Sequence, residues 1–297
     1  MARTRFRPDP GLSARMGGVS LALGALYVAF AALLISSTNI ALGLVITLGM
    51  AWGQWYFSDT LALRSMNARD VSPEQAPELH AMIDRLCVMA DMPKPRVTVA
   101  VTDLPNAFAT GRSPSHSAVC VTTGLMQRVD ADELEGVLAH ELAHVAHRDV
   151  SVMTVASSLG LLAGFITRWG FYLGDGNRRG NHNNVPFFVV LLASMVVYFL
   201  SFLLTRALSR YRELSADRSG AYLTGRPSKL ASALVKISGD MSRIPNRDLR
   251  DSEAISAFFF APAINRESLT AVMATHPPLE QRLAQLAKVG AELSDPL

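Results

Sequence analysis

The chain has 297 residues, of which 49% are hydrophobic and only 18% are charged, and its mean hydropathy is +0.23. Soluble domains carry about 25% charged residues, so this deficit indicates that apolar residues are concentrated in segments that contact lipid. The net charge of +3 comes without a long Lys/Arg run, and we therefore expect no nucleic-acid partner. The two cysteines, Cys87 and Cys120, are too few for a disulfide scaffold and form no CxxC pair.

Apolar runs long enough to cross a bilayer as helices occur four times along the chain. The first run is too long for the apolar part of a signal peptide, and the second follows almost at once, so a hairpin of spanning helices is expected. Arg168 interrupts the third run, which is the weakest. We expect a mainly α membrane protein with four transmembrane helices, at Met16–Ser37, Ile40–Phe57, Val150–Leu173 and Val185–Thr205.

Arginines beside these runs predict the orientation of the chain. The N-terminal tail is basic, Arg64 and Arg69 follow the second run, and further arginines follow the fourth. Because positively charged loops stay in the cytoplasm, both large polar regions are predicted to be cytoplasmic. Arg178 and Arg179, between the third and fourth runs, oppose this weakly. The expected division is a tail and hairpin (1–57), a half-domain (58–149), a second transmembrane pair (150–205) and a second half-domain (206–297).

The polar regions are predicted to combine helices with a small β-sheet. Ser72-Pro73-Glu74 is a helix start, and apolar residues at helical spacing continue to Ala90. Two stretches have the character of strands, Arg96–Val101 and Ser117–Thr122, with Asn106–Gly111 between them. A further helix is expected to begin near Asp130 and to run through His147 toward the third apolar run.

A metal-binding pattern, HExxH, lies within this helix as His140-Glu141-Leu142-Ala143-His144. Residues four apart share one helix face, so His140 and His144 can bind a single tetrahedral zinc ion. Glu141 projects beside them, where its carboxylate can take a proton from an attacking water. Because HExxH also arises by chance, the third ligand decides how much weight the pattern carries.

The third ligand is expected downstream. A metzincin site would need glycine at position 147 and histidine at position 150, but the sequence has His147 and Val150, which excludes that class. Glu213 and Asp217 lie four residues apart in a helical stretch. Glu213 can therefore bind the metal while Asp217 orients a ligand histidine. The alternative is a solvated acidic pair beside the neighbouring arginines.

With these motifs, the chain resembles the HtpX-type membrane endopeptidases, which are related to the CAAX prenyl-protein endopeptidases. The resemblance covers nearly the whole chain and implies a gluzincin-like catalytic domain with one zinc ion. It implies a multi-pass protein of a bacterial-type cell membrane, with a cytoplasmic active site that degrades damaged or misassembled membrane proteins. Besides the apolar runs, it rests on NAFATG (Asn106–Gly111), HELAHVAHRD (His140–Asp149), SRYRELSAD (Ser209–Asp217) and THPPLEQR (Thr275–Arg282).

The resemblance also implies roles for supporting residues. His276 would stabilise the oxyanion, although a cap or packing role is equally compatible. Arg282 is expected to pair with a buried carboxylate, either Asp217 or Asp149. Phe258–Phe260 lies in a segment that departs from the family pattern and is interpreted as core, with a substrate-receiving surface as the alternative. A substrate-aligning edge strand is implied for Asn106, Ala107, Phe108 and Ala109, and an ordinary hairpin strand is the alternative.

The expected reaction is hydrolysis of peptide bonds, with zinc held by His140, His144 and Glu213 and with Glu141 as the base. A prenyl-protein protease would need a larger membrane chamber than four spans provide. A zinc-stabilised scaffold would close the metal with four protein ligands and would not need a glutamate base. A transporter is disfavoured because the apolar runs hold no ionisable residue apart from Arg168.

Overall fold

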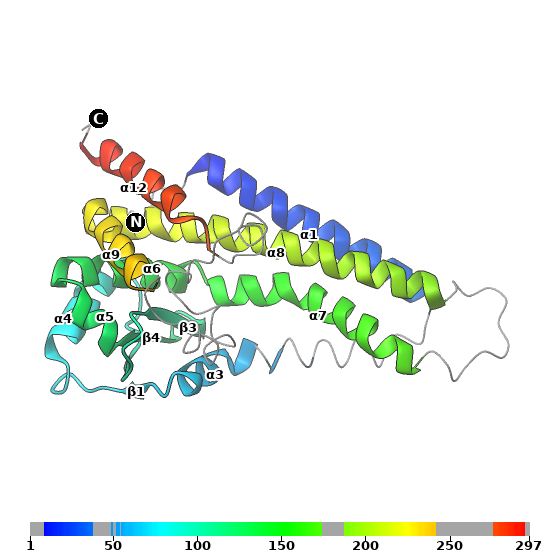
Figure 1. Ribbon diagram of the computed structural model, residues 1–297, viewed down its shortest axis with the longest axis horizontal. Coiled ribbons are helices and arrows are strands. Elements are labelled where there is room, and N and C mark those ends of the chain that lie inside the picture. The colour runs from blue at the N-terminus through cyan, green and yellow to red at the C-terminus, as the bar shows by residue number, and fades with distance from the viewer. Residues whose placement is uncertain are drawn as a thin grey trace.

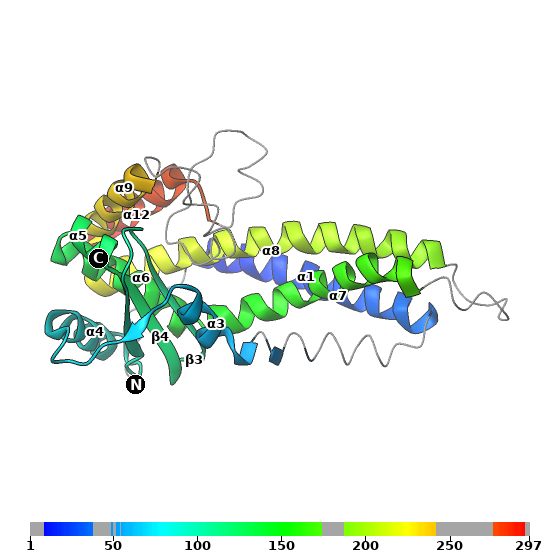
Figure 2. The same ribbon diagram turned by 60° about the horizontal axis from the view of Figure 1, so that its bottom comes forward.

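The computed structural model describes residues 9–37, 49, 52–53, 55–173, 187–241 and 276–294. Three long helices lie side by side along the length of the molecule, and the sheet and shorter helices gather at one end (Figure 1). The long helices are α1 (Pro10–Ser37), α7 (Asp149–Leu173) and α8 (Phe187–Thr224). The view in Figure 2 gives the same arrangement, an elongated helical part attached to an α+β head. The mainly helical class with a small sheet is therefore confirmed.

The long helices bury one set of apolar side chains against one another and expose another. Phe30 of α1, Leu159 of α7 and Val197 of α8 belong to one buried cluster. On the outer faces, Leu21 is 76% exposed and Phe188 is 69% exposed. Helices that are apolar on both the packed and the outward face are typical of a lipid environment.

Four membrane-spanning helices are expected from the sequence, but only two helices qualify among the residues that the structure describes. α1 over Pro10–Leu33 and α8 over Phe188–Thr224 are long and apolar enough to cross a membrane. In α7 only Asp149–Gly164 counts as an apolar helix among the described residues, and this stretch is shorter than the roughly 20 residues that a spanning helix needs. The run Ile40–Phe57 falls mostly outside the described residues, and Phe258–Phe260 falls wholly outside them.

The head contains a four-stranded mixed sheet in the order β1-β2-β4-β3. The two predicted strands are confirmed as β2 (Arg96–Ala100) and β4 (His116–Thr122), which pair in parallel. β3 (Ala107–Ser113) pairs antiparallel with β4 and forms one edge of the sheet. The short β1 (Arg69–Asp70) at the other edge was not predicted, since two residues carry no periodicity.

Helices cover the sheet and enclose the core of the head. They are α3 (Ser58–Ser65), α4 (Pro77–Ala90), α5 (Thr123–Arg128), α6 (Ala131–Ala146), α9 (Pro227–Met241) and α12 (Leu279–Ser294). In the core, α6 contributes Leu138 and Leu142, which are fully buried together with Ile83 of α4 and Leu234 of α9. α6 is thus the central helix of the head, between the sheet and the C-terminal helices.

Both ends of α6 are fixed by specific contacts. At its start, Asp130 and Glu133 form a capping box, in which each side chain accepts a hydrogen bond from the other residue's backbone N–H. At its end, His147 is the C-cap and Arg148 has a left-handed φ of 56°. The helix predicted to run through His147 toward the third apolar run therefore ends at Ala146, because the left-handed Arg148 separates α6 from α7.

Candidate metal centre and active site

The HExxH histidines and the predicted third ligand meet between α6 and α8. One donor atom from each of His140, His144 and Glu213 lies within 4.8 Å of the others. The Nε2 atoms of the two histidines are 3.0 Å apart. Glu213 carboxylate oxygens lie 3.6 Å from Nε2 of His140 and 3.4 Å from Nε2 of His144. Donors at tetrahedral positions around zinc lie about 3.3 Å from one another, so this His₂Glu set fits the ion.

Close helix packing holds these ligands together. Gly220 of α8 lies one turn from Asp217 and faces the backbone of α6. A Cβ atom placed on Gly220 would lie 2.8 Å from the backbone nitrogen of His140. No other residue type could bring α8 this near to α6, so glycine at this position sets the separation between the two ligand-bearing helices.

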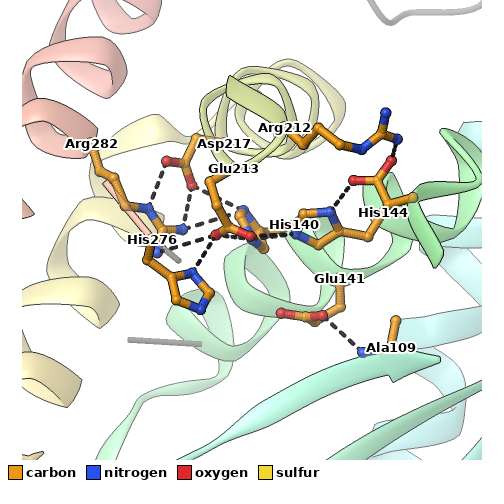
Figure 3. Close-up of polar contacts among 10 residues, drawn as sticks. Ala109, His140, Glu141, His144, Arg212, Glu213, Asp217, His276 and Arg282 are labelled. Atoms are coloured by element: carbon orange, nitrogen blue, oxygen red, sulfur yellow. Dashed lines mark hydrogen bonds and ion pairs between the residues drawn. The ribbon is translucent and has the colours of Figure 1, made fainter. Parts of the chain in front are cut away.

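Asp217 and Arg282 lie behind His140, as Figure 3 shows. Nδ1 of His140 lies 2.9 Å from Oδ1 of Asp217. Arg282 of α12 donates two hydrogen bonds to Asp217, of 2.8 and 2.6 Å. Asp217 and Arg282 are 0% and 1% exposed, so this ion pair is fully buried. Of the two carboxylates expected for Arg282, the structure selects Asp217.

His144 has a carboxylate partner of its own, which sequence reasoning did not assign to it. Its Nδ1 lies 2.5 Å from Oδ2 of Asp149, the first residue of α7. Arg212 contacts the other oxygen of Asp149. The closeness of the two residues is visible in the sequence, since Asp149 follows His144 by five residues. The bend at Arg148, which turns the Asp149 side chain back toward His144, has no sequence signal.

Glu141 lies between the ligand set and the edge strand. Its carboxylate accepts a hydrogen bond of 2.9 Å from the backbone N–H of Ala109 in β3 (Figure 3). Burial raises the pKa of Glu141 above the usual glutamate range. A raised pKa brings a carboxylate nearer to neutral pH, where it can both accept and return a proton.

The residues expected to align substrate begin this edge strand. Ala107, Phe108 and Ala109 open β3, and Asn106 directly precedes it. Asn106 is buried, and its backbone N–H donates to the hydroxyl of Thr122. The side chains of Ala107 and Phe108 are also buried, so these side chains offer little surface to an extended peptide.

His276 precedes α12 and is brought to the metal-binding side chains from a distant part of the sequence. Its Nδ1 lies 3.0 Å from Oε2 of Glu213, and the side chain is buried. Among the described residues, neither ring nitrogen has a hydrogen-bond partner of good geometry. A buried imidazole with unused polar atoms is suited to contact a ligand in the site.

The charges around the histidines shift their protonation equilibria. Burial lowers the pKa of His140, but the carboxylates of Asp217 and Glu213 outweigh burial and raise it overall. Burial also lowers the pKa of His144, but the Glu213 carboxylate outweighs burial and raises this pKa overall. Without a metal, both imidazoles therefore hold a proton to higher pH than an ordinary histidine does.

Comparisons with known proteins agree with this geometry. The family model described as Peptidase family M48 matches residues 73–289. The chain is 53% identical over 296 residues to "Protease HtpX homolog 1" of Streptomyces coelicolor, covering 99% of this chain and 97% of that protein. It is 50% identical over 301 residues to "Protease HtpX homolog" of Moorella thermoacetica, covering 99% of each chain.

A solved structure has a similar fold. The crystal structure of S. mikatae Ste24p matches with a TM-score of 0.55 at 18% identity, covering 94% of this chain and 67% of that one. This likeness supports the fold alone. The family model and the HtpX relatives, by contrast, cover most of the sequence and include the HExxH helix and Glu213. The chain therefore belongs to peptidase family M48, as an HtpX homologue and a metalloendopeptidase.

Proposed function

We propose that the chain is an integral-membrane zinc endopeptidase that cleaves unfolded or misassembled membrane proteins at the cytoplasmic face of a cell membrane. His140, His144 and Glu213 hold the zinc ion, and Glu141 is the catalytic base. The observation that carries this proposal is the position of Glu141. Its carboxylate is next to the His₂Glu set and is hydrogen-bonded to the backbone of the edge strand.

Zinc at this site supplies a Lewis acid that polarises a carbonyl and lowers the pKa of water. Glu141 takes a proton from the attacking water and delivers it to the leaving amine. Its raised pKa supports the second of these steps. His276 is close enough to the ligand set to donate a hydrogen bond to the oxyanion, which supports the role that the family resemblance implies.

The edge strand supports a main-chain mode of substrate binding. A peptide in extended conformation adds to Asn106–Ala109 through backbone hydrogen bonds, which require no particular side chains. An added strand at this edge passes beside Glu141, because the Ala109 N–H is already in contact with that carboxylate. Loose sequence preference and a need for unfolded substrate both follow from this mode of binding.

Contacts beside α7 support a membrane interface next to the head. Trp52 and Tyr56 stack on each other and are exposed, and the guanidinium of Arg112 lies 4.7 Å from the centre of the Tyr56 ring. The indole of Trp55 donates to Ser151 in the first turn of α7. Aromatic and arginine side chains gather in this way at the level of lipid headgroups.

In this proposal, α1 and α8 anchor the chain in the bilayer, and residues 58–149 and 206–297 form the two halves of the cytoplasmic catalytic domain. The tail and first apolar segment (1–57) and the stretch 150–205 supply the membrane part. The arginines that follow α8's apolar portion support this orientation. α8 then links the membrane part directly to Glu213, because the helix continues unbroken to Thr224.

The test is cleavage of casein, an unfolded reporter, by the full chain purified in detergent. The protein is stripped with a chelator, reloaded with zinc, and compared with Glu141→Gln. We expect cleavage to return with zinc in the wild-type chain alone, while both proteins bind the metal. Cleavage by Glu141→Gln at the wild-type rate would refute the assignment of the base.

A further inference from the structure

The two nitrogens of the His144 ring face different partners. Nε2 faces the metal-binding set, where it lies 3.0 Å from Nε2 of His140 and 3.4 Å from Oε1 of Glu213. Nδ1 faces away from this set, and its partner is Oδ2 of Asp149 at 2.5 Å. The Asp149 side chain is only 10% exposed, so water competes little for this contact.

Arg212, which lies on α8, is the second partner of Asp149. Its guanidinium contacts Oδ1 of Asp149 and donates a hydrogen bond of 3.1 Å to the carbonyl of His147. The Arg212 side chain is only 7% exposed. Arg212 is therefore tied both to the carboxylate that meets His144 and to the backbone that ends the HExxH helix, and it directly precedes the ligand Glu213 in the sequence.

We infer that Asp149 and Arg212 are a positioning pair for the metal ligand His144. This inference rests on the proposed function, because it takes His144 as a zinc ligand. Asp149 accepts a hydrogen bond from Nδ1–H, which fixes the tautomer in which the Nε2 lone pair faces the metal and makes Nε2 a better donor to the metal. Arg212 holds the buried Asp149 carboxylate in place, because its guanidinium contacts the oxygen that does not face His144 and is itself tied to the carbonyl of His147.

The partners of His140 support this inference. His140 Nδ1 meets Asp217, and Asp217 is held by Arg282. Both ligand histidines thus have a carboxylate on Nδ1 and a buried arginine behind the carboxylate. The sources differ, because α8 and α12 supply one pair and α7 and α8 supply the other. The Asp149–Arg212 pair therefore makes the orientation of His144 depend on how α7 packs against α8.

The inference is tested by the zinc affinity of the full chain in detergent, measured by competition with a chromophoric chelator. Removing such a partner typically weakens metal binding by about 10–100-fold, and we expect Asp149→Asn to fall in this range. Asp149→Leu, which offers no acceptor, should weaken binding further, and Asp149→Glu should recover part of the loss. The matched controls are Asp132→Asn and Arg226→Met, which break an exposed ion pair of 2.7 Å remote from the metal site and should leave the affinity unchanged.

Cobalt substitution separates positioning from general stability. The visible absorption of bound Co²⁺ depends on its ligand geometry, so Asp149→Asn should alter the spectrum at saturating cobalt, and the two controls should not. If Asp149→Asn does not fold, Arg212→Lys keeps the buried positive charge but replaces the planar guanidinium, one terminal nitrogen of which contacts both Asp149 and the carbonyl of His147. We expect weakened zinc binding and an altered cobalt spectrum for this variant too.

The outcomes distinguish the inference from the proposed function. A wild-type chain that binds no zinc would overturn the ligand assignment itself. A wild-type chain that binds zinc, with Asp149→Asn and Arg212→Lys binding it within twofold and giving the wild-type cobalt spectrum, would overturn only the positioning role.

Discussion

Gly220 on α8 faces the backbone of His140 on α6 so closely that a methyl group at position 220 would lie 2.8 Å from the His140 nitrogen. The helices that carry His140 and Glu213 thus meet through backbone atoms at this point, with no side chain between them. This contact has a direct experimental consequence.

Gly220→Ala should force α8 away from α6 and so disturb the spacing of the ligands. Overpacking of a close core contact costs about 1–3 kcal/mol, and we expect a loss of stability in this range together with weaker zinc binding. Thermal unfolding and chelator competition measure the two effects. Gly239→Ala is the control, because a Cβ at that position meets none of the described residues within 4 Å. Equal zinc affinity in Gly220→Ala and Gly239→Ala would contradict the prediction.

Glu141→Gln should abolish proteolysis without releasing the metal. The amide keeps the shape of the side chain but cannot take a proton, and loss of a general base costs about 10²–10⁴-fold in rate. Casein cleavage and zinc content, measured on the same preparation, provide the check. A variant that loses zinc and activity together would show instead that Glu141 is needed to build the site.

Arg282→Met should be among the most damaging substitutions in the head. It leaves Asp217 buried without its partner, and breaking a buried ion pair in this way costs about 3–5 kcal/mol. Arg226→Met removes an exposed partner of Asp132 and should cost little. Denaturant unfolding of the zinc-free proteins makes the comparison. Similar midpoints for the two variants would be incompatible with a buried role for Arg282.

Zinc binding should weaken as the pH falls. A histidine must be neutral to bind zinc, and the raised pKa values of His140 and His144 mean that both hold protons in the metal-free site to above the usual histidine range. Zinc must therefore displace protons near neutral pH, and its apparent affinity should rise with pH. Calorimetry in buffers of different ionisation enthalpy counts the protons released. A zinc affinity that stays the same from about pH 5 to pH 8 would contradict this linkage.

The sequence was sufficient to predict that His140, His144 and Glu213 meet as a candidate metal site, because HExxH on a helix has a fixed geometry and Glu213 has its own helical spacing with Asp217. It was also sufficient for β2, β4 and the edge position of Asn106–Ala109, where the family resemblance and strand character agreed. Both kinds of evidence are local, or are carried by motifs. Predictions from these two kinds of evidence therefore do not depend on how the helices and strands pack against one another.

Features that depend on packing were not predictable. The separation of α6 from α7 rests on a left-handed arginine, Arg148, and arginine is not a residue that signals this conformation. The pairing of Asp149 with Arg212 joins residues 63 positions apart, and no periodicity reports such a contact. Among the described residues two helices rather than four qualify as spans, since the third run counts as an apolar helix only over Asp149–Gly164 and the second run lies mostly outside those residues.

In the membrane arrangement proposed above, the continuity of α8 sets a fixed height for the reaction above the bilayer. Its apolar stretch ends at Leu204 and Glu213 follows nine residues later, which at a rise of about 1.5 Å per residue is about 14 Å. An extended chain advances about 3.4 Å per residue, so a polypeptide must project about four residues from the lipid before its backbone reaches the metal site. On this proposal, α8 limits cleavage to backbone outside the membrane, so that bonds inside an intact membrane segment are spared and those of a segment that has left the bilayer are exposed.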